Sequence, residues 1–182
     1  RHHAAPRRSR SATASGVNSN VIAAVVINGG TVDTINTGVY TTMSGLNNSG
    51  ASSITMNGGS VLSRGGIGLW ARHGSVGLAQ VQMTGGRVES KGINGDAILA
   101  SNTNGTYAVE VTGGTLIGSS GFGAAIHTAA KAGGTVNIGA GAVVDGSASG
   151  VALRDGDLVR DGIDEVGGNA IITTAGTLTG AV

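Results

Sequence analysis

Five of the ten acidic residues fall in one stretch, RDGDLVRDGIDEVGG at residues 154–168. Carboxylate oxygens are preferred ligands of calcium, so this stretch is a candidate calcium loop. Its spacing does not match an EF-hand loop, which needs glycine at position six and glutamate at position twelve. The ordinary alternative is a solvated acidic loop that keeps a glycine-rich protein soluble. The candidate ligands are Asp155, Asp157, Asp161, Asp164 and Glu165.

The remaining residues offer little for catalysis. The serines are spread along the chain, so no Ser–His–Asp arrangement can be argued. His73 and His127 are expected on strands two coils apart, as surface or edge residues, and metal ligands usually come in local sets. Outside the acidic stretch, the sequence therefore predicts no metal site, and it predicts no cofactor and no catalytic residue.

Aromatic and basic side chains alternate with apolar ones in several short segments. If Val39, Leu69, Ile98, Ile126 and Leu153 point inward, the residues next to them face solvent. Exposed aromatics beside arginine are typical of binding hot spots. The alternative is that Trp70 stacks on Tyr40 only to stabilise a solvent-facing sheet. The predicted contact face comprises Tyr40, Thr42, Trp70, Arg72, His127 and Arg154.

A repeat must position these residues. Its first glycine recurs at positions 29, 58, 85 and 113, with Ala140 in the fifth copy, at intervals of 27 to 29 residues. A period held over five or six copies indicates a solenoid. The copies are VVINGGTV (25–32), ITMNGGSV (54–61), VQMTGGRV (81–88), VEVTGGTL (109–116), the degenerate VNIGAGAV (136–143) and the looser ITTAGTL (172–178).

Each period contains three strand-like pieces separated by Gly and Asn turns. Paired glycines suit tight corners because glycine adopts positive φ at little cost. The second piece is centred in successive copies on Val32, Val61, Val88, Leu116 and Val143. The pattern predicts an all-β fold, a right-handed parallel β-helix of about five or six coils over residues 21–182. The acidic stretch lengthens one period, which predicts a protruding loop at about residues 154–168.

Composition supports a folded rod. The chain has 35 glycines and no cysteine, and it is 40% hydrophobic and 12% charged, which is too apolar for a disordered tract. Four of the 11 basic residues lie in the first ten positions, and from Val17 onward the balance is 7 − 10 = −3, so no nucleic-acid partner is expected. Residues 1–20 are interpreted as a disordered basic arm or a remnant of cloning.

The repeat [VI]-x-[IVM]-x-G-G-x-[VL]-x-[ST], followed by a G-x-[AV]-[IL] strand, resembles the passenger domains of Gram-negative autotransporters. The pertactin-like and AIDA-like adhesins are the nearest models, and the resemblance covers about residues 21–182. It implies a β-helix at the cell surface or released outside the cell. It also implies an outer-membrane β-barrel translocator in the same precursor, of which this chain shows no sign.

The resemblance implies a stalk or adhesin acting in adhesion, aggregation and virulence. Its partner would be a host-cell protein or glycan, or another copy of the chain. Two alternatives stay open. One is a fragment of a β-helical polysaccharide lyase or hydrolase, which would need three or more aligned Asp residues across consecutive coils. The other is a self-associating structural module.

Overall fold

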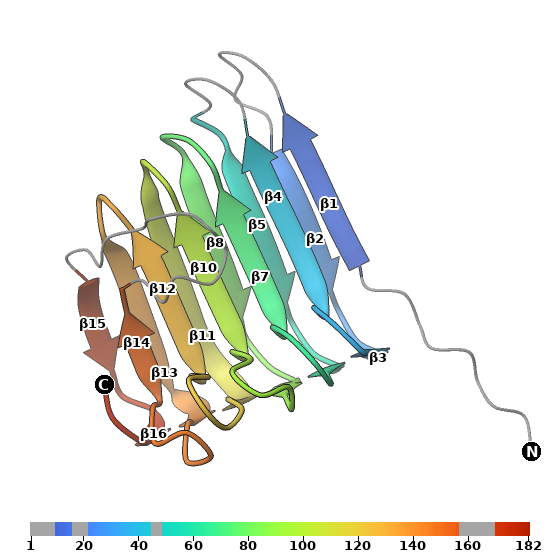
Figure 1. Cartoon of the computed structure of the whole chain (residues 1–182), viewed down its shortest axis with the longest axis vertical. Helices are drawn as coiled ribbons and strands as arrows, with labels where there is room; N and C mark the ends of the chain where they lie inside the picture. Colours follow the sequence, from blue (N-terminus) through green and yellow to red (C-terminus); the bar gives the residue numbers. More distant parts are fainter. Residues whose placement is uncertain (1–9, 16–21, 45–48, 157–169) are drawn as a thin grey trace, which may run out of the picture.

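The computed structural model describes residues 10–15, 22–44, 49–156 and 170–182. This part of the chain is all-β, and its parallel strands stack as a β-solenoid of about five turns (Figure 1). The predicted fold is therefore confirmed. Within the described ranges no helix is long and apolar enough to cross a membrane.

One face of the solenoid is a six-stranded parallel sheet, which lies in front in Figure 1. All but the first of these strands are the third piece of a predicted period. Val39, Leu69, Ile98, Ile126 and Leu153 stand in register across them and are buried, as expected. In spatial order the sheet comprises β1 (Arg10–Ser15), β4 (Val39–Ser44), β7 (Leu69–His73), β10 (Ile98–Asn102), β12 (Ile126–Ala130) and β14 (Leu153–Asp155).

The first and second pieces form a ten-stranded sheet that bends at the glycine corner. In the fourth and fifth coils the two pieces join into single long strands, where separate strands were predicted. The strands are β2 (Ile22–Ile27), β3 (Thr31–Thr34), β5 (Ala51–Met56), β6 (Ser60–Ser63), β8 (Leu78–Met83), β9 (Arg87–Ser90), β11 (Thr106–Ile117), β13 (Gly134–Asp145), β15 (Ala170–Thr174) and β16 (Thr177–Thr179).

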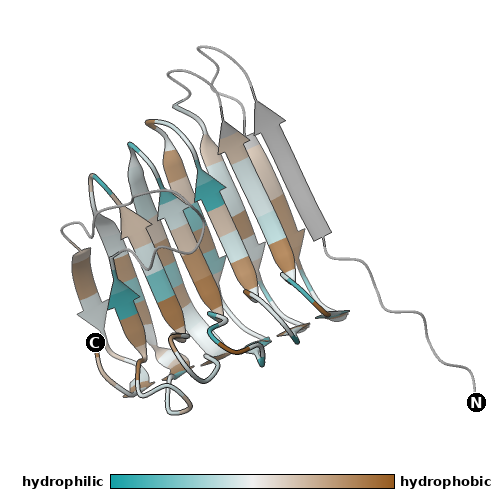
Figure 2. Ribbon diagram, viewed as in Figure 1, coloured by the Kyte–Doolittle hydropathy of each residue, from teal (hydrophilic) through white to brown (hydrophobic). Residues whose placement is uncertain are grey.

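Aligned apolar side chains fill the interior between the two sheets. β-Branched residues dominate because they pack well on a pleated surface. Figure 2 shows the resulting bands of hydrophobic and hydrophilic residues across the strands. One buried column runs through Ile54, Val81, Val109 and Val136, each in register with the next.

Serine hydroxyls at the corner between the second and third pieces of the repeat donate hydrogen bonds to backbone carbonyls. Ser63 Oγ donates to the Asn36 carbonyl at 2.5 Å, Ser90 Oγ to that of Gly66 at 2.6 Å, and Ser119 Oγ to that of Gly95 at 2.7 Å. Buried carbonyls left unpaired would destabilise the fold. Ser63 and Ser90, which end β6 and β9, and Ser119, two residues beyond β11, therefore each link a corner to that of the preceding coil.

The paired-glycine corner explains the repeat. In the first four coils the second glycine of each pair has positive φ: Gly30 (79°), Gly59 (91°), Gly86 (93°) and Gly114 (92°). Stacking adds a second constraint, because a Cβ at Gly86 would lie 2.6 Å from the Gly59 carbonyl oxygen. At Gly86 the corners of successive coils are thus too close for a side chain.

The alignment of the fifth copy is wrong by one residue. Gly141, rather than Ala140, stands in register with Gly113, because a register shift occurs after Val111. The same shift places Val144 in the core column with Leu116, while Val143 is 39% exposed. A β-bulge absorbs the extra residue, which periodic spacing alone cannot reveal.

The structure also changes the boundary of the N-terminal arm. Arg10–Ser15 forms strand β1, paired in parallel with β4, so the prediction of a disordered arm is wrong for these residues. Arg10 occupies the register position of Val39. The rest of the arm, at residues 1–9 and 16–20, lies outside the described residues.

Candidate contact face

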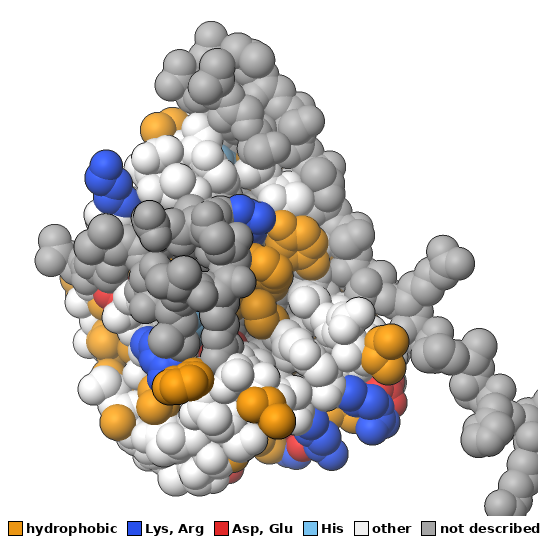
Figure 3. Space-filling view, viewed as in Figure 1, with side chains coloured by type: hydrophobic (Ala, Val, Ile, Leu, Met, Phe, Trp, Pro, Cys, Tyr) orange, Lys and Arg blue, Asp and Glu red, His pale blue; other side chains and the backbone are white. Residues whose placement is uncertain are grey.

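Tyr40 and Trp70 lie side by side on the outward surface of the six-stranded sheet. They stand in register on β4 and β7, and both are half-buried. Their ring centroids are 4.8 Å apart with the planes tilted by 45°, a favourable aromatic contact. The predicted proximity of the two aromatics is confirmed. Figure 3 views this face and shows hydrophobic side chains gathered beside a basic one.

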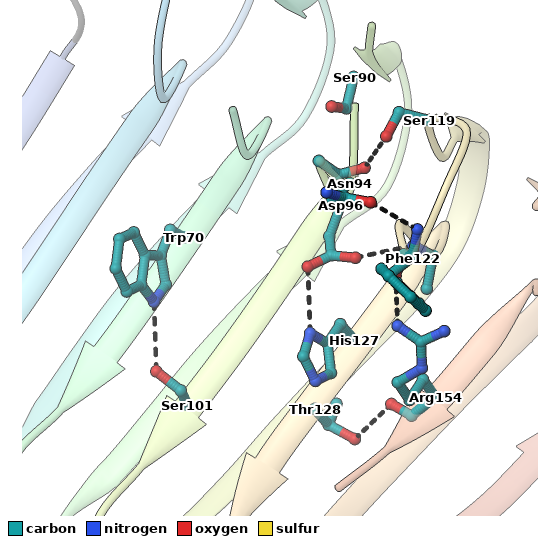
Figure 4. A network of polar contacts seen from close by, with 12 residues as sticks. Trp70, Ser90, Asn94, Asp96, Ser101, Ser119, Phe122, His127, Thr128 and Arg154 are labelled. Atoms are coloured by element: carbon teal, nitrogen blue, oxygen red, sulfur yellow. Dashed lines mark hydrogen bonds and ion pairs between the residues drawn. The ribbon is translucent and has the colours of Figure 1, made fainter. Parts of the chain in front are cut away.

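Two polar contacts fix the orientation of Trp70. Its indole Nε1–H donates to Ser101 Oγ at 3.2 Å, which fixes one edge of the ring (Figure 4). The Arg72 guanidinium carbon lies 6.0 Å from the Trp70 ring centroid, at the limit of a cation–π contact. Thr42 stands beside Arg72 in register and is half-buried. We call Tyr40, Thr42, Trp70 and Arg72 the aromatic patch.

Arg72 has no acidic partner among the described residues. The ion pairs of these residues instead involve Arg64 with Asp33, Glu89 with Arg87 and Lys91, and Asp96 with His127. The Arg72 guanidinium is therefore a cation beside an aromatic surface, with its charge uncompensated by the described part of the protein.

His127 is buried, which corrects its prediction as a solvent-facing residue. It occupies the outward register position expected, yet only 4% of its surface is exposed. Its neighbour in register, Leu99, is buried as well. The outward-pointing side chains are thus half-buried in the aromatic patch and buried further along the sheet, at Leu99 and His127.

Asp96 is the residue that the sequence analysis missed. Its Oδ2 lies 3.0 Å from His127 Nδ1, and its Oδ1 accepts the Ala124 N–H at 2.7 Å (Figure 4). The other ring nitrogen, Nε2, lies 2.9 Å from the Gly156 carbonyl oxygen. Both ring nitrogens therefore face oxygen atoms, and the doubly protonated imidazolium offers each of them an N–H donor.

The pKa of His127 is raised above its ordinary value of 6.5. Burial, the largest single influence, acts to lower it, but the hydrogen bond and charge of Asp96 together with the Gly156 carbonyl outweigh burial. His127 and Asp96 thus form a buried ion pair, and the described partner of Nε2 is the Gly156 carbonyl oxygen. The arrangement links the loop before β10 and strand β12 to the end of β14.

His73 is also buried, so its prediction as a surface or edge residue is wrong, but its pKa shifts in the opposite direction to that of His127. Its side chain is fully buried, and its Nδ1 accepts the Ser75 N–H at 3.1 Å. Burial lowers the pKa of His73, against the hydrogen bonds of the Ser75 and Gly50 backbone. It shares the parity of Leu69 on β7, a signal in the sequence that could have placed it inside.

Arg154 lies apart from the aromatic patch. It stands three strands from Trp70 in the register, roughly 14 Å at the usual strand spacing. Its guanidinium donates to the Phe122 carbonyl (Figure 4). Of the six predicted contact residues, the structure brings four together and separates His127 and Arg154 from them.

Asp155 is the one candidate calcium ligand that lies among the described residues. This residue belongs to β14, and its Oδ1 accepts hydrogen bonds from the Tyr107 and Thr128 hydroxyls, each at 2.8 Å. Burial raises the pKa of the Tyr107 phenol, which keeps it a donor. The candidates Asp157, Asp161, Asp164 and Glu165 lie outside the described residues. Among those described, no three potential ligands gather as a metal site.

Comparisons with known proteins identified no relative. No protein-family model, no curated protein and no solved structure matches the chain.

Proposed function

We propose that this chain is a surface-exposed or secreted passenger segment of a Gram-negative autotransporter, acting as a stalk or adhesin. The aromatic patch is its contact surface. The observation that carries the proposal is the pairing of a half-buried Trp70–Tyr40 platform with an arginine that has no acidic partner among the described residues. The regular solenoid and the resemblance of its repeat support the cellular role.

The geometry of the acidic residues gives less support to a polysaccharide-cleaving enzyme. Asp33, Glu89 and Asp145 share one register column, but Leu62 and Ile117 separate them. A general acid in such an enzyme needs a raised pKa. Arg64 instead lowers the pKa of Asp33, and hydrogen bonds with Ser147 lower that of Asp145.

Replacing Trp70 by alanine is expected to reduce binding of the purified chain to cultured epithelial cells by about tenfold or more, the loss typical of an aromatic hot spot. The matched control is Ile93→Ala, since Ile93 is 78% exposed on a corner loop away from the patch. Both variants are compared with the parent at equal foldedness by circular dichroism. Equal binding of Trp70→Ala and the parent would contradict the proposal.

A further inference from the structure

We propose that the aromatic patch binds an acidic saccharide, with a sugar ring on the Trp70–Tyr40 platform and a carboxylate or sulfate on Arg72. This inference rests on the proposed function and specifies its ligand. It follows from the chemistry that the four side chains present together.

The aromatic pair supplies an apolar surface of fixed orientation. Trp70 is held by Ser101 and packs against Tyr40, so its ring has little freedom to lose when a ligand binds. A rigid surface costs less entropy on binding than a mobile one. The carbon-bound hydrogens on the face of a sugar ring suit such a platform, because they carry partial positive charge toward the negative face of the indole.

Charge determines which saccharide fits. Arg72 is the cation of the patch, and its fork of donors matches a carboxylate or a sulfate. Thr42, beside it in register, adds a hydroxyl of the kind that pairs with sugar hydroxyls. A neutral saccharide would leave the guanidinium uncompensated in the interface, which weakens binding.

Nucleic acid is the other ligand that combines stacking surfaces with negative charge. The described face offers one guanidinium beside the rings, and the chain from Val17 onward has a net charge of 7 − 10 = −3. Polynucleotide binding depends on many phosphate contacts. The patch therefore fits an acidic saccharide, of which one carboxylate or sulfate meets Arg72, better than a polynucleotide.

The test is a titration followed by the fluorescence of Trp70, the only tryptophan in the chain. The probes are dextran sulfate, uncharged dextran of equal length and a single-stranded oligonucleotide. We expect dextran sulfate to change the emission, and we expect dextran to leave it unchanged. Arg72→Gln should weaken dextran sulfate binding by about tenfold or more, the effect of losing a charge-assisted hydrogen bond.

The control is Arg8→Gln, which removes an equal charge from the basic head of the sequence. Non-specific attraction would weaken about equally in both variants, and that result would overturn the inference. Equal response to the oligonucleotide, or no response to dextran sulfate, would overturn it as well. If cell binding still depends on Trp70 in those cases, the proposed function stands and only the ligand class is wrong. If the chain shows neither a response to dextran sulfate nor cell binding that depends on Trp70, the ligand class and the proposed function are both wrong.

Discussion

Gly86→Ala is expected to lower the free energy of unfolding by about 3 kcal/mol, since strain at positive φ and overpacking each cost about 1–3 kcal/mol. The new Cβ would meet the Gly59 carbonyl oxygen at 2.6 Å and the Gly58 carbonyl carbon at 3.0 Å. Both are backbone atoms of the coil below and have little room to move. Urea unfolding followed by circular dichroism measures the effect.

Gly30→Ala is the matched control for this prediction. Gly30 has a similar positive φ of 79°, but a Cβ there would meet nothing within 4 Å. Its cost is therefore the backbone strain alone, about 1 kcal/mol. Equal losses in the two variants would show that φ alone, and not the stacking of corners, requires the repeated glycine.

Asp96→Ala is expected to cost about 3–5 kcal/mol at acidic to neutral pH, the range for leaving one partner of a buried ion pair uncompensated. His127 would then lose its carboxylate while remaining 4% exposed. The Ala124 N–H would also lose its acceptor. Denaturant unfolding of the parent and the variant over a range of pH measures this loss.

The parent and Asp96→Ala differ in their free energy of unfolding, and the pKa of His127 determines how this difference depends on pH. Because the folded-state pKa is raised above 6.5, the contribution of the ion pair is full below that value. It is lost as pH rises through the raised pKa. We therefore expect the cost of Asp96→Ala to be largest at low pH and to shrink as pH rises.

His73 adds a dependence of the opposite sign. Its folded-state pKa lies below 6.5, so the folded state loses stability as pH falls below that value. This contribution is present in parent and Asp96→Ala alike and cancels in their difference. A difference that stays constant with pH would contradict the charged state assigned to His127.

Much of the fold was predictable because the period and the parity of apolar residues both repeat. Val39 and Leu69 mark the inward side of the first sheet, and the same parity places Tyr40 beside Trp70. The bulge after Val111 was not predictable in this way, since a single added residue leaves the period nearly unchanged. It places Val144 in the core where the sequence predicted Val143.

The candidate site was predictable only within neighbouring strands. Register identified the aromatic patch, but the ion pair of His127 depends on Asp96, which lies in the loop between β9 and β10. No spacing rule connects a loop residue to a strand residue one coil later. The inward position of His73, by contrast, follows from strand parity, although the sequence interpretation favoured the surface.

Hydroxyl-radical footprinting of the chain, free and bound to cultured cells, tests the contact face most directly. Oxidation of Trp70 is read by mass spectrometry and normalised to Phe122, which is 63% exposed on a corner loop. We expect Trp70 to be protected in the cell-bound protein while Phe122 is oxidised as in the free protein. Equal oxidation of Trp70 in the two states would contradict the assignment of the aromatic patch as the contact surface.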